Sequence, residues 1–333
     1  MNQNSKKIWI YLALSFGIPW TAALVISQSS IMENHPDQAA AIANGIFISF
    51  PWLANIAARL ITREGWSALW LHPKIRKSWR YYLALWFLPF LATIAGGLIF
   101  YLLFSKSYDP NLSALRNLAQ NASLPAESSP WTLFLQITFS LMFISVPINT
   151  VASMGEEFGW RAYLLPKLML HFNRHSSVED GSGDAPADTS LFASAFSEGA
   201  ARKAAMLTGL IHGVWHLPLI LMTTSSTPSA SALTLLVYLL FTCSLSILLS
   251  WGTLKSGSAW PAAVGHGAAN AASVLPGFLL SGQPVPWMGP DPTGLVGGLG
   301  YIILALVLFF GKGFTGGKEK IRTAPVKRCQ ISP

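Results

Sequence analysis

The chain has 333 residues, of which 52% are hydrophobic and only 11% are charged, and its formal net charge is +8. Soluble domains carry about 25% charged residues, so this composition excludes an ordinary soluble protein and indicates a membrane protein. The positive charge does not indicate a nucleic-acid partner, because the basic residues are distributed as in a membrane protein. The two cysteines, Cys243 and Cys329, lie in an apolar run and in a basic tail, so they do not form a disulfide framework.

Eight apolar segments are long enough to cross a bilayer, which needs roughly 20 residues. In chain order they are residues 8–27, 39–61, 81–104, 131–152, 204–223, 231–251, 259–280 and 293–311. The second and the seventh are rich in Ala and Gly, which suits buried helices because small residues let neighbouring backbones approach closely. The sequence therefore predicts an all-α fold, a polytopic membrane helix bundle of about eight transmembrane helices.

The basic residues predict how this bundle is oriented. With a cytoplasmic N-terminus, 20 of the 22 Lys and Arg residues fall on the cytoplasmic side, and only Lys106 and Arg116 fall outside. We therefore expect an integral multi-pass protein of the cell membrane with both termini in the cytoplasm. A signal peptide is the competing interpretation of the first apolar run, but the run is long for one and lacks a small-residue cleavage site.

The loops between these segments divide the chain into three regions. Residues 1–128 hold the N-terminal transmembrane helices and an interfacial segment at 64–80, in which Trp and Leu are mixed with basic residues. Residues 129–282 form a central bundle, interrupted by a polar, flexible cytoplasmic loop at 173–200. Residues 283–333 hold the last span and a basic cytoplasmic tail.

Polar side chains within or next to the apolar segments mark the candidate site, because charge inside a membrane is costly and usually functional. Seven such residues lie on three predicted helices: Glu156, Glu157, Arg161, His212, His216, His266 and Asn270. Their positions place them in the cytoplasmic half of the bilayer, where they can converge on one pocket. A lone intramembrane histidine is more often a packing residue, but scattered packing residues would have no reason to agree in depth.

Spacing along each helix assigns these residues to faces. His212 and His216 are four residues apart and share one face, as do His266 and Asn270. Glu157 and Arg161 are also four apart, with the acid first, which is the favourable order for a helical ion pair. We interpret Glu157 and Arg161 as supporting residues that neutralise one carboxylate beside Glu156.

The candidate residues other than Glu157 and Arg161 are of the types that catalyse hydrolysis. Two histidines and a glutamate are a familiar catalytic zinc set that leaves one position for water. A carboxylate and an imidazole can also activate water directly as a general base. A further His and Asn can donate hydrogen bonds to a developing oxyanion. The candidate cofactor is therefore a divalent metal, with zinc the best match.

Three motifs in this order resemble the type II CAAX prenyl endopeptidase family, also known as the CPBP or Abi intramembrane metalloproteases. They are E-E-x-x-x-R at 156–161, W-H-L-P at 215–218 and H-x-x-x-N at 266–270. The resemblance covers about residues 130–280 and identifies the central bundle as the expected catalytic region.

The resemblance implies a role for each matching residue. Glu156 and His216 would activate the attacking water, while His266 and Asn270 would stabilise the oxyanion or help to hold a metal. The metal ligands would then be Glu156, His216 and His266. The family pattern F-x-x-x-H has an aromatic residue where this chain has His212, so His212 is expected to pack beside the site in preference to acting as a further ligand.

We therefore expect a hydrolase, an intramembrane endopeptidase that cleaves a peptide bond near the cytoplasmic face. Its partners would be membrane lipids and a peptide or membrane-protein substrate, and no nucleic acid. The alternative is a non-proteolytic immunity or scaffold protein with the same fold, and the intact set of four site residues favours the enzyme. A proton-coupled transporter would show paired halves, and the sequence has no internal repeat.

Overall fold

The computed structural model describes residues 3–66, 69–121, 129–179, 196–224, 232–282, 285 and 287–314. In this part of the chain all regular elements are helical, apart from an isolated bridge between Tyr108 and Leu280. The predicted all-α fold is therefore confirmed. Residues 180–195 of the predicted loop and residues 315–333 of the predicted tail lie outside the described residues.

Six helices of the described chain are long and apolar enough to cross a membrane. They are α1 (Gln3–Ser27), α3 (Pro36–Thr62), α4 (Ile75–Leu103), the continuous helix Pro130–Asn173, α9 (Glu198–Thr224) and α10 (Ala232–Ser256). The seventh and eighth predicted spans contain the shorter helices α11 (Trp260–Ala272) and α12 (Leu299–Phe310). A polytopic bundle is thus confirmed, while the count of eight spans stays a prediction.

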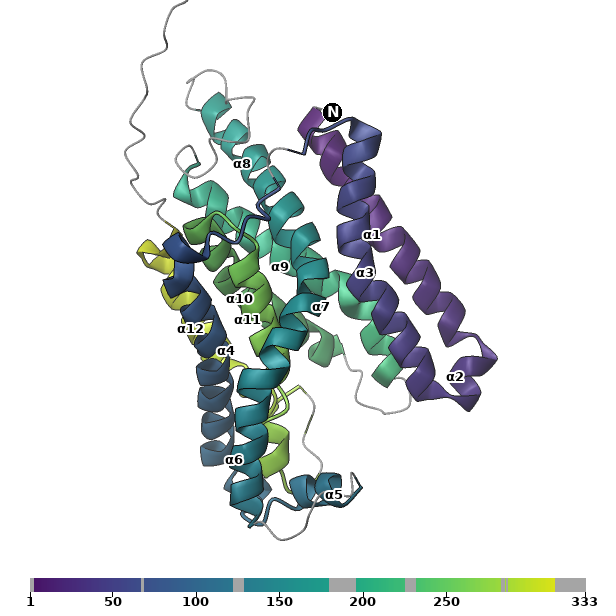
Figure 1. The fold of residues 1–333 in the computed structure, drawn as a ribbon, viewed down its shortest axis with the longest axis vertical. Coiled ribbons are helices and arrows are strands. Elements are labelled where there is room, and N and C mark those ends of the chain that lie inside the picture. Colours follow the sequence, from purple (N-terminus) through teal and green to yellow (C-terminus); the bar gives the residue numbers. More distant parts are fainter. Residues whose placement is uncertain are drawn as a thin grey trace, which may run out of the picture.

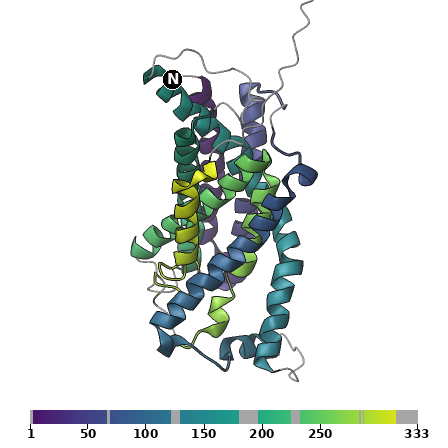
Figure 2. The ribbon, with the colours of Figure 1, turned by 90° about the vertical axis from the view of Figure 1, so that its left-hand side faces the viewer.

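The short helices α2 (Ser30–Asn34) and α5 (Ser113–Asn121) lie at one end of the molecule, and the N-terminus and α8 (Leu165–Glu179) lie at the other (Figures 1 and 2). The sequence placed the first two outside and the second two in the cytoplasm. The arrangement of the helices agrees with that assignment, although the direction of the bundle in a membrane stays a prediction.

One long helix passes through the bundle and carries the predicted glutamates (Figure 1). It consists of α6 (Pro130–Ser140), a π-helical segment Leu141–Ser145, α7 (Val146–Gly159), a second π-helical segment Trp160–Leu164, and α8. The part of this helix from Pro130 to Asn173 has 44 residues and measures about 66 Å at 1.5 Å per residue, about twice the hydrocarbon thickness of a bilayer.

The sequence predicted that this span ends near residue 152, with Glu156 at the end of its helix, and the structure corrects that boundary. The helix continues because the residues that follow Glu157 are apolar and buried against other helices, among them Trp160, Tyr163 and Leu164. The preceding part of the helix is different, since Phe139, Ile148 and neighbouring apolar residues are exposed. Such a surface is expected to face lipid.

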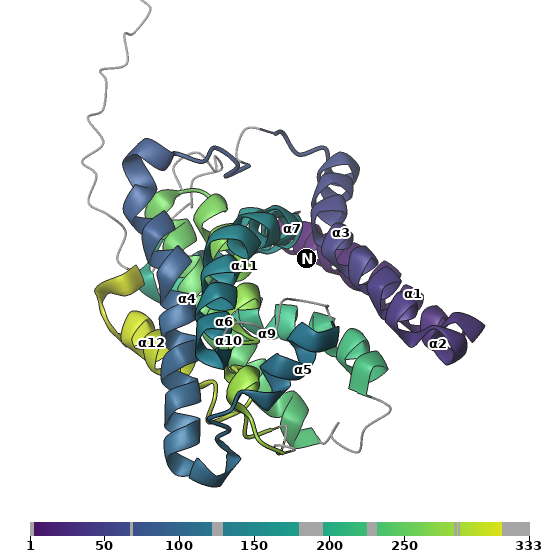
Figure 3. The same ribbon diagram turned by 60° about the horizontal axis from the view of Figure 1, so that its bottom comes forward.

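Helix α11 occupies the centre of the bundle, where it packs against α4, α7 and α10 (Figure 3). Small residues on α11 allow its backbone to approach those of the neighbouring helices closely. A methyl group at Gly267 would lie 2.7 Å from the backbone nitrogen of Thr150 and 2.9 Å from the backbone carbon of Asn149. The Ala- and Gly-rich composition therefore marks a buried helix, as the sequence indicated.

Candidate active site

The candidate residues meet where α7, α9 and α11 pack together. Glu156 and Glu157 lie on α7, and a helix turns successive residues about 100° apart, so the two carboxylates face different neighbours. His212 and His216 lie on α9, and His266 lies on α11. Four of these side chains are buried, and that of His216 is 18% exposed.

Trp215 fixes the depth of this site. Its indole Nε1 donates to the backbone oxygen of Ser15 at 2.8 Å, and its own carbonyl oxygen accepts from Nε1 of Trp20 at 3.0 Å. Ser15 is the middle residue of α1. The site therefore lies near the mid-length of a spanning helix, deeper than the helix-end position predicted for Glu156.

Glu156 is in contact with both histidines of α9. Its Oε2 atom lies 2.9 Å from Nε2 of His212 and 3.8 Å from Nε2 of His216. One ligand-type atom from each of the three residues lies within 4.8 Å of the others. Carboxylate oxygen and imidazole nitrogen are ligands that zinc accepts, so this group fits a divalent metal ion.

Glu157 forms a second acid–histidine pair. Its Oε1 atom accepts hydrogen bonds from Nδ1 of His266 at 2.8 Å and from Nη1 of Arg161 at 3.1 Å. Glu157 and Arg161 are fully buried, and the structure places them together as the spacing predicted. Nothing in the sequence pattern indicated that His266 would bond to Glu157, because that contact depends on how α7 and α11 are rotated against each other.

The two acid–histidine pairs are neighbours. The ring centroids of His212 and His266 are 5.7 Å apart, and those of His212 and His216 are 5.0 Å apart. Asn270, one turn beyond His266, is exposed. In the described part of the chain no hydrogen bond joins the Asn270 amide to Glu156 or to a histidine, so this amide remains open to another molecule.

Aromatic rings enclose the histidines of α9. Trp160 lies 5.3 Å from the ring of His212, while Trp215 and Phe47 lie 4.6 and 6.4 Å from the ring of His216, all measured between centroids. These rings replace water around the polar groups, which strengthens the electrostatic interactions inside the site. No periodic pattern in the sequence distinguishes Trp160 or Phe47 from the many other aromatic residues.

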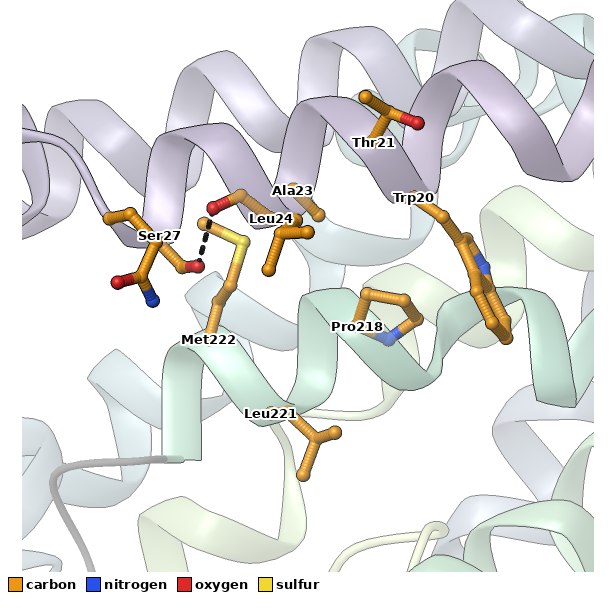
Figure 4. Close-up of a pocket in the computed structure, with 9 residues that line it drawn as sticks. Trp20, Thr21, Ala23, Leu24, Ser27, Pro218, Leu221 and Met222 are labelled. Atoms are coloured by element: carbon orange, nitrogen blue, oxygen red, sulfur yellow. Dashed lines mark hydrogen bonds between the residues drawn. The ribbon is translucent and has the colours of Figure 1, made fainter.

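A cavity of 630 Å³ lies between α1 and α9, beside the turn that follows His216. Figure 4 shows Trp20 and Leu24 of α1 and Pro218 of α9 pointing toward one another across this space, and Leu221 of α9 also lines the cavity. The lining is mainly apolar, and the side chains of Leu24 and Leu221 are 64% and 46% exposed. The cavity is thus open toward the surface on which a membrane protein meets lipid.

The fold and the site together define a polytopic helical membrane protein that contains a buried Glu/His/His group capable of holding a metal ion. Residues 136–272 match the Rce1-like family of type II CAAX prenyl endopeptidases. The matching segment runs from α6 to the end of α11 and contains every candidate residue named above. The resemblance inferred from the three motifs is therefore confirmed, and the family is one of peptidases. No curated protein matches the chain.

Proposed function

We propose that this protein is an intramembrane endopeptidase that hydrolyses a peptide bond within the bundle. The observation that carries the proposal is the buried Glu156 carboxylate, which faces two imidazole nitrogens near the mid-length of α1. The family match favours the same reaction class. A scaffold or immunity protein would gain nothing from burying this costly group of ionisable side chains.

Glu156 is the general base of the proposed reaction. His212 donates from Nε2 to the Glu156 carboxylate and fixes its orientation. His216 Nε2 lies 3.8 Å from the same oxygen, beyond hydrogen-bonding distance, so both groups can bond to one water molecule. Glu156 takes a proton from that water as it attacks the peptide carbonyl and then gives the proton to the departing amine.

His266 and Asn270 are the proposed partners of the carbonyl oxygen. Glu157 accepts from Nδ1 of His266 and thereby fixes the ring. In the neutral ring Nε2 then has a lone pair that can bind a metal, and in the doubly protonated ring Nε2 can donate to the oxyanion. Arg161 holds Glu157 in turn. The exposed amide of Asn270 can donate from the next turn of the same helix.

A divalent metal ion, with zinc the best match, suits this set of carboxylate and imidazole ligands. Glu156, His212 and His216 would hold the ion, which would replace the proton between His212 and Glu156. Nε2 of His266 is a further candidate ligand. When bound, such an ion polarises a carbonyl group and lowers the pKa of a coordinated water.

The proposed substrate is a peptide or membrane protein, with membrane lipids as the surrounding partners and no nucleic acid. The cavity between α1 and α9 supports this choice, because its apolar lining suits an apolar stretch of polypeptide that enters from the bilayer (Figure 4). Cleavage near the cytoplasmic face was expected from the sequence, and the level of Ser15 favours a deeper position.

The test compares the purified wild-type protein with Glu156→Gln, both in lipid nanodiscs and mixed with membrane proteins of the same cell. New N-termini are mapped by mass spectrometry, and the metal content of each sample is measured. Cleavage sites that appear with the wild type and are absent with the variant establish the peptidase. Identical termini in the two samples would exclude proteolysis and leave the scaffold protein as the explanation.

A further inference from the structure

Tyr238 of α10 is a side chain of the site that the three motifs do not contain. Its ring lies edge-on to the ring of His216, with the centroids 6.3 Å apart and the planes at 85°. The ring is partly buried. A fourth helix therefore places a tyrosine next to His216, whose Nε2 atom lies 3.8 Å from Oε2 of Glu156.

The hydroxyl group of Tyr238 differs from that of a structural tyrosine. Among the described residues no hydrogen bond to it is found, and it is not one of the buried polar atoms that lack a partner, so the oxygen atom borders accessible space. Tyr301 provides the contrast, since its hydroxyl bonds to Thr93 and to the backbone oxygen of Pro89. The Tyr301 hydroxyl stabilises the bundle, whereas the Tyr238 hydroxyl is free to bond to a bound molecule.

The contact between α9 and α10 is what places Tyr238 beside His216. Gly209 and Gly213 form a G-x-x-x-G pattern on the face of α9 that meets α10. A methyl group at Gly209 would lie 2.6 Å from Cβ of Ser246 and 2.7 Å from Cα of Cys243. One at Gly213 would collide with Thr242. The two backbones therefore pack closely, and the side chains of α10 reach the level of the histidines.

We propose that Tyr238 is a further catalytic residue, whose hydroxyl donates a hydrogen bond to the peptide oxygen as that oxygen becomes negatively charged. This inference rests on the proposed hydrolysis. When water attacks, the pair of electrons of the C=O π bond moves onto the oxygen, and the phenol O–H bonds to that oxygen without losing its proton. The donor comes from α10, so it approaches the substrate from the His216 side, while His266 and Asn270 approach from α11.

The experiment measures kcat, KM and thermal stability of Tyr238→Phe in nanodiscs, with an internally quenched fluorescent peptide that contains the cleavage site mapped above. We expect kcat to fall about 10²–10³-fold, the usual loss of one oxyanion donor, with KM and thermal stability close to the wild type. Tyr301→Phe is the matched control. It also removes one hydroxyl group, but it should lower thermal stability and leave kcat unchanged.

The possible results separate this inference from the proposed function. If the wild type cleaves the peptide, Glu156→Gln does not, and Tyr238→Phe keeps kcat within about threefold, the inference is overturned and the peptidase stands. A change confined to KM would also overturn it, because it would show a contact made equally before and during attack. A wild type no more active than Glu156→Gln would overturn both.

Discussion

Nε2 of His212 and Oε2 of Glu156 lie 2.9 Å apart, a direct contact between α9 and α7 across 56 positions of the chain. Both side chains are buried, at 5% and 8% exposure. The sequence pattern favoured a packing role for His212, because related motifs have an aromatic residue at its position. The geometry favours a polar role, since the imidazole lies within hydrogen-bonding distance of the proposed general base.

Replacing His212 by Phe should therefore inactivate the protein even though an aromatic ring is kept. The Glu156 carboxylate would lose its bonded partner, and any bound metal would lose one of three ligands. We expect both turnover and metal content to fall at least about tenfold, as for loss of groups that hold a metal site. His35→Phe, at an exposed position before α3, is the control and should change neither quantity. Normal turnover and metal content in His212→Phe would show that His212 is a packing residue, as the sequence pattern indicated.

Glu157→Gln should lower both the stability and the turnover of the protein, whereas Glu156→Gln should lower turnover alone. The change weakens the acceptor of two buried donors, His266 Nδ1 and Arg161 Nη1. Breaking a buried charge pair costs about 3–5 kcal/mol, so the unfolding temperature should fall. In Glu156→Gln we expect turnover to fall by orders of magnitude with little change in unfolding temperature.

A double-mutant cycle tests the link between Glu157 and Arg161. Each single change, Glu157→Gln or Arg161→Ala, leaves one buried group without its partner, so the losses in unfolding free energy should be less than additive in the double variant. Additive losses would show that the two side chains do not act as a pair. If Glu157→Gln were fully stable yet inactive, Glu157 and not Glu156 would be the catalytic carboxylate.

The carboxyl group of Glu64, just after α3, should make stability depend on pH. Its Oε2 atom lies 2.5 Å from Nζ of Lys167 and 3.5 Å from Nζ of Lys7. Burial raises the pKa of Glu64, but Lys167, Lys7 and Arg59 outweigh burial, and the net effect is a lowered pKa. A carboxyl whose pKa is lower in the folded state stabilises the protein above its unfolded pKa of about 4.3, and that stabilisation is lost as pH falls through the folded value.

The measurement is the unfolding temperature of the wild type and of Glu64→Gln between pH 7 and pH 3. At pH 7 the variant should be less stable by about 1–3 kcal/mol, because Lys167 is left buried without its partner. The difference should shrink below about pH 4. Glu33→Gln, at an exposed position on α2, should show no such difference. A difference in stability that stays constant from pH 7 to pH 3 would show that the charge of Glu64 does not stabilise the protein.

Gly213→Ala tests whether close packing of α9 on α10 is needed for activity. The added methyl would collide with Thr242 and lie 2.8 Å from Cδ2 of Leu239, the residue after Tyr238. Pushing α10 outward should cost about 1–3 kcal/mol and, by displacing Tyr238, about 10²-fold in kcat. Gly17→Ala on α1 is the matched control, because no atom lies within 4 Å of a methyl group there. Equal kcat values in the two variants would contradict this role for α10.

The predicted sidedness can be tested with reporter fusions. Fusions after residues 35 and 120 should report the outside, and fusions after residues 75 and 255 the cytoplasm, because 20 of the 22 basic residues then lie in the cytoplasm. The opposite pattern at all four positions would invert the bundle, and one inverted position would change the number of spans.

Much of the fold follows from sequence because apolar segments of sufficient length have few alternatives to a membrane helix. The end of the fourth span was not predictable in this way. Glu156, Glu157 and Arg161 resembled charges at a membrane boundary, but bonds to His212 and His266 and the internal ion pair allow the helix to continue past them.

The site was predictable to the level of helix faces. Four-residue spacing correctly put His212 beside His216, whose rings are 5.0 Å apart. Which histidine meets which glutamate depends on the rotation of α7 against α9 and α11, and periodicity contains no information on that rotation. Tyr238 could not be found from spacing either, because its partner His216 belongs to another helix.

The π-helical segments Leu141–Ser145 and Trp160–Leu164 on either side of the glutamates have a consequence for how this helix tolerates change in length. Each π turn takes up one residue more than an α turn, and so absorbs a residue that in a regular α-helix would rotate everything after it by about 100°. Deleting one residue from the second segment should therefore restore a regular α-helix and leave both Glu156 and Leu168 facing their present neighbours. Deleting one residue from α7 between the two segments would instead rotate one part of the helix against the other by about 100°. The helix thus tolerates the loss of a residue at its π turns and not at the α-helical segment that contains the glutamates.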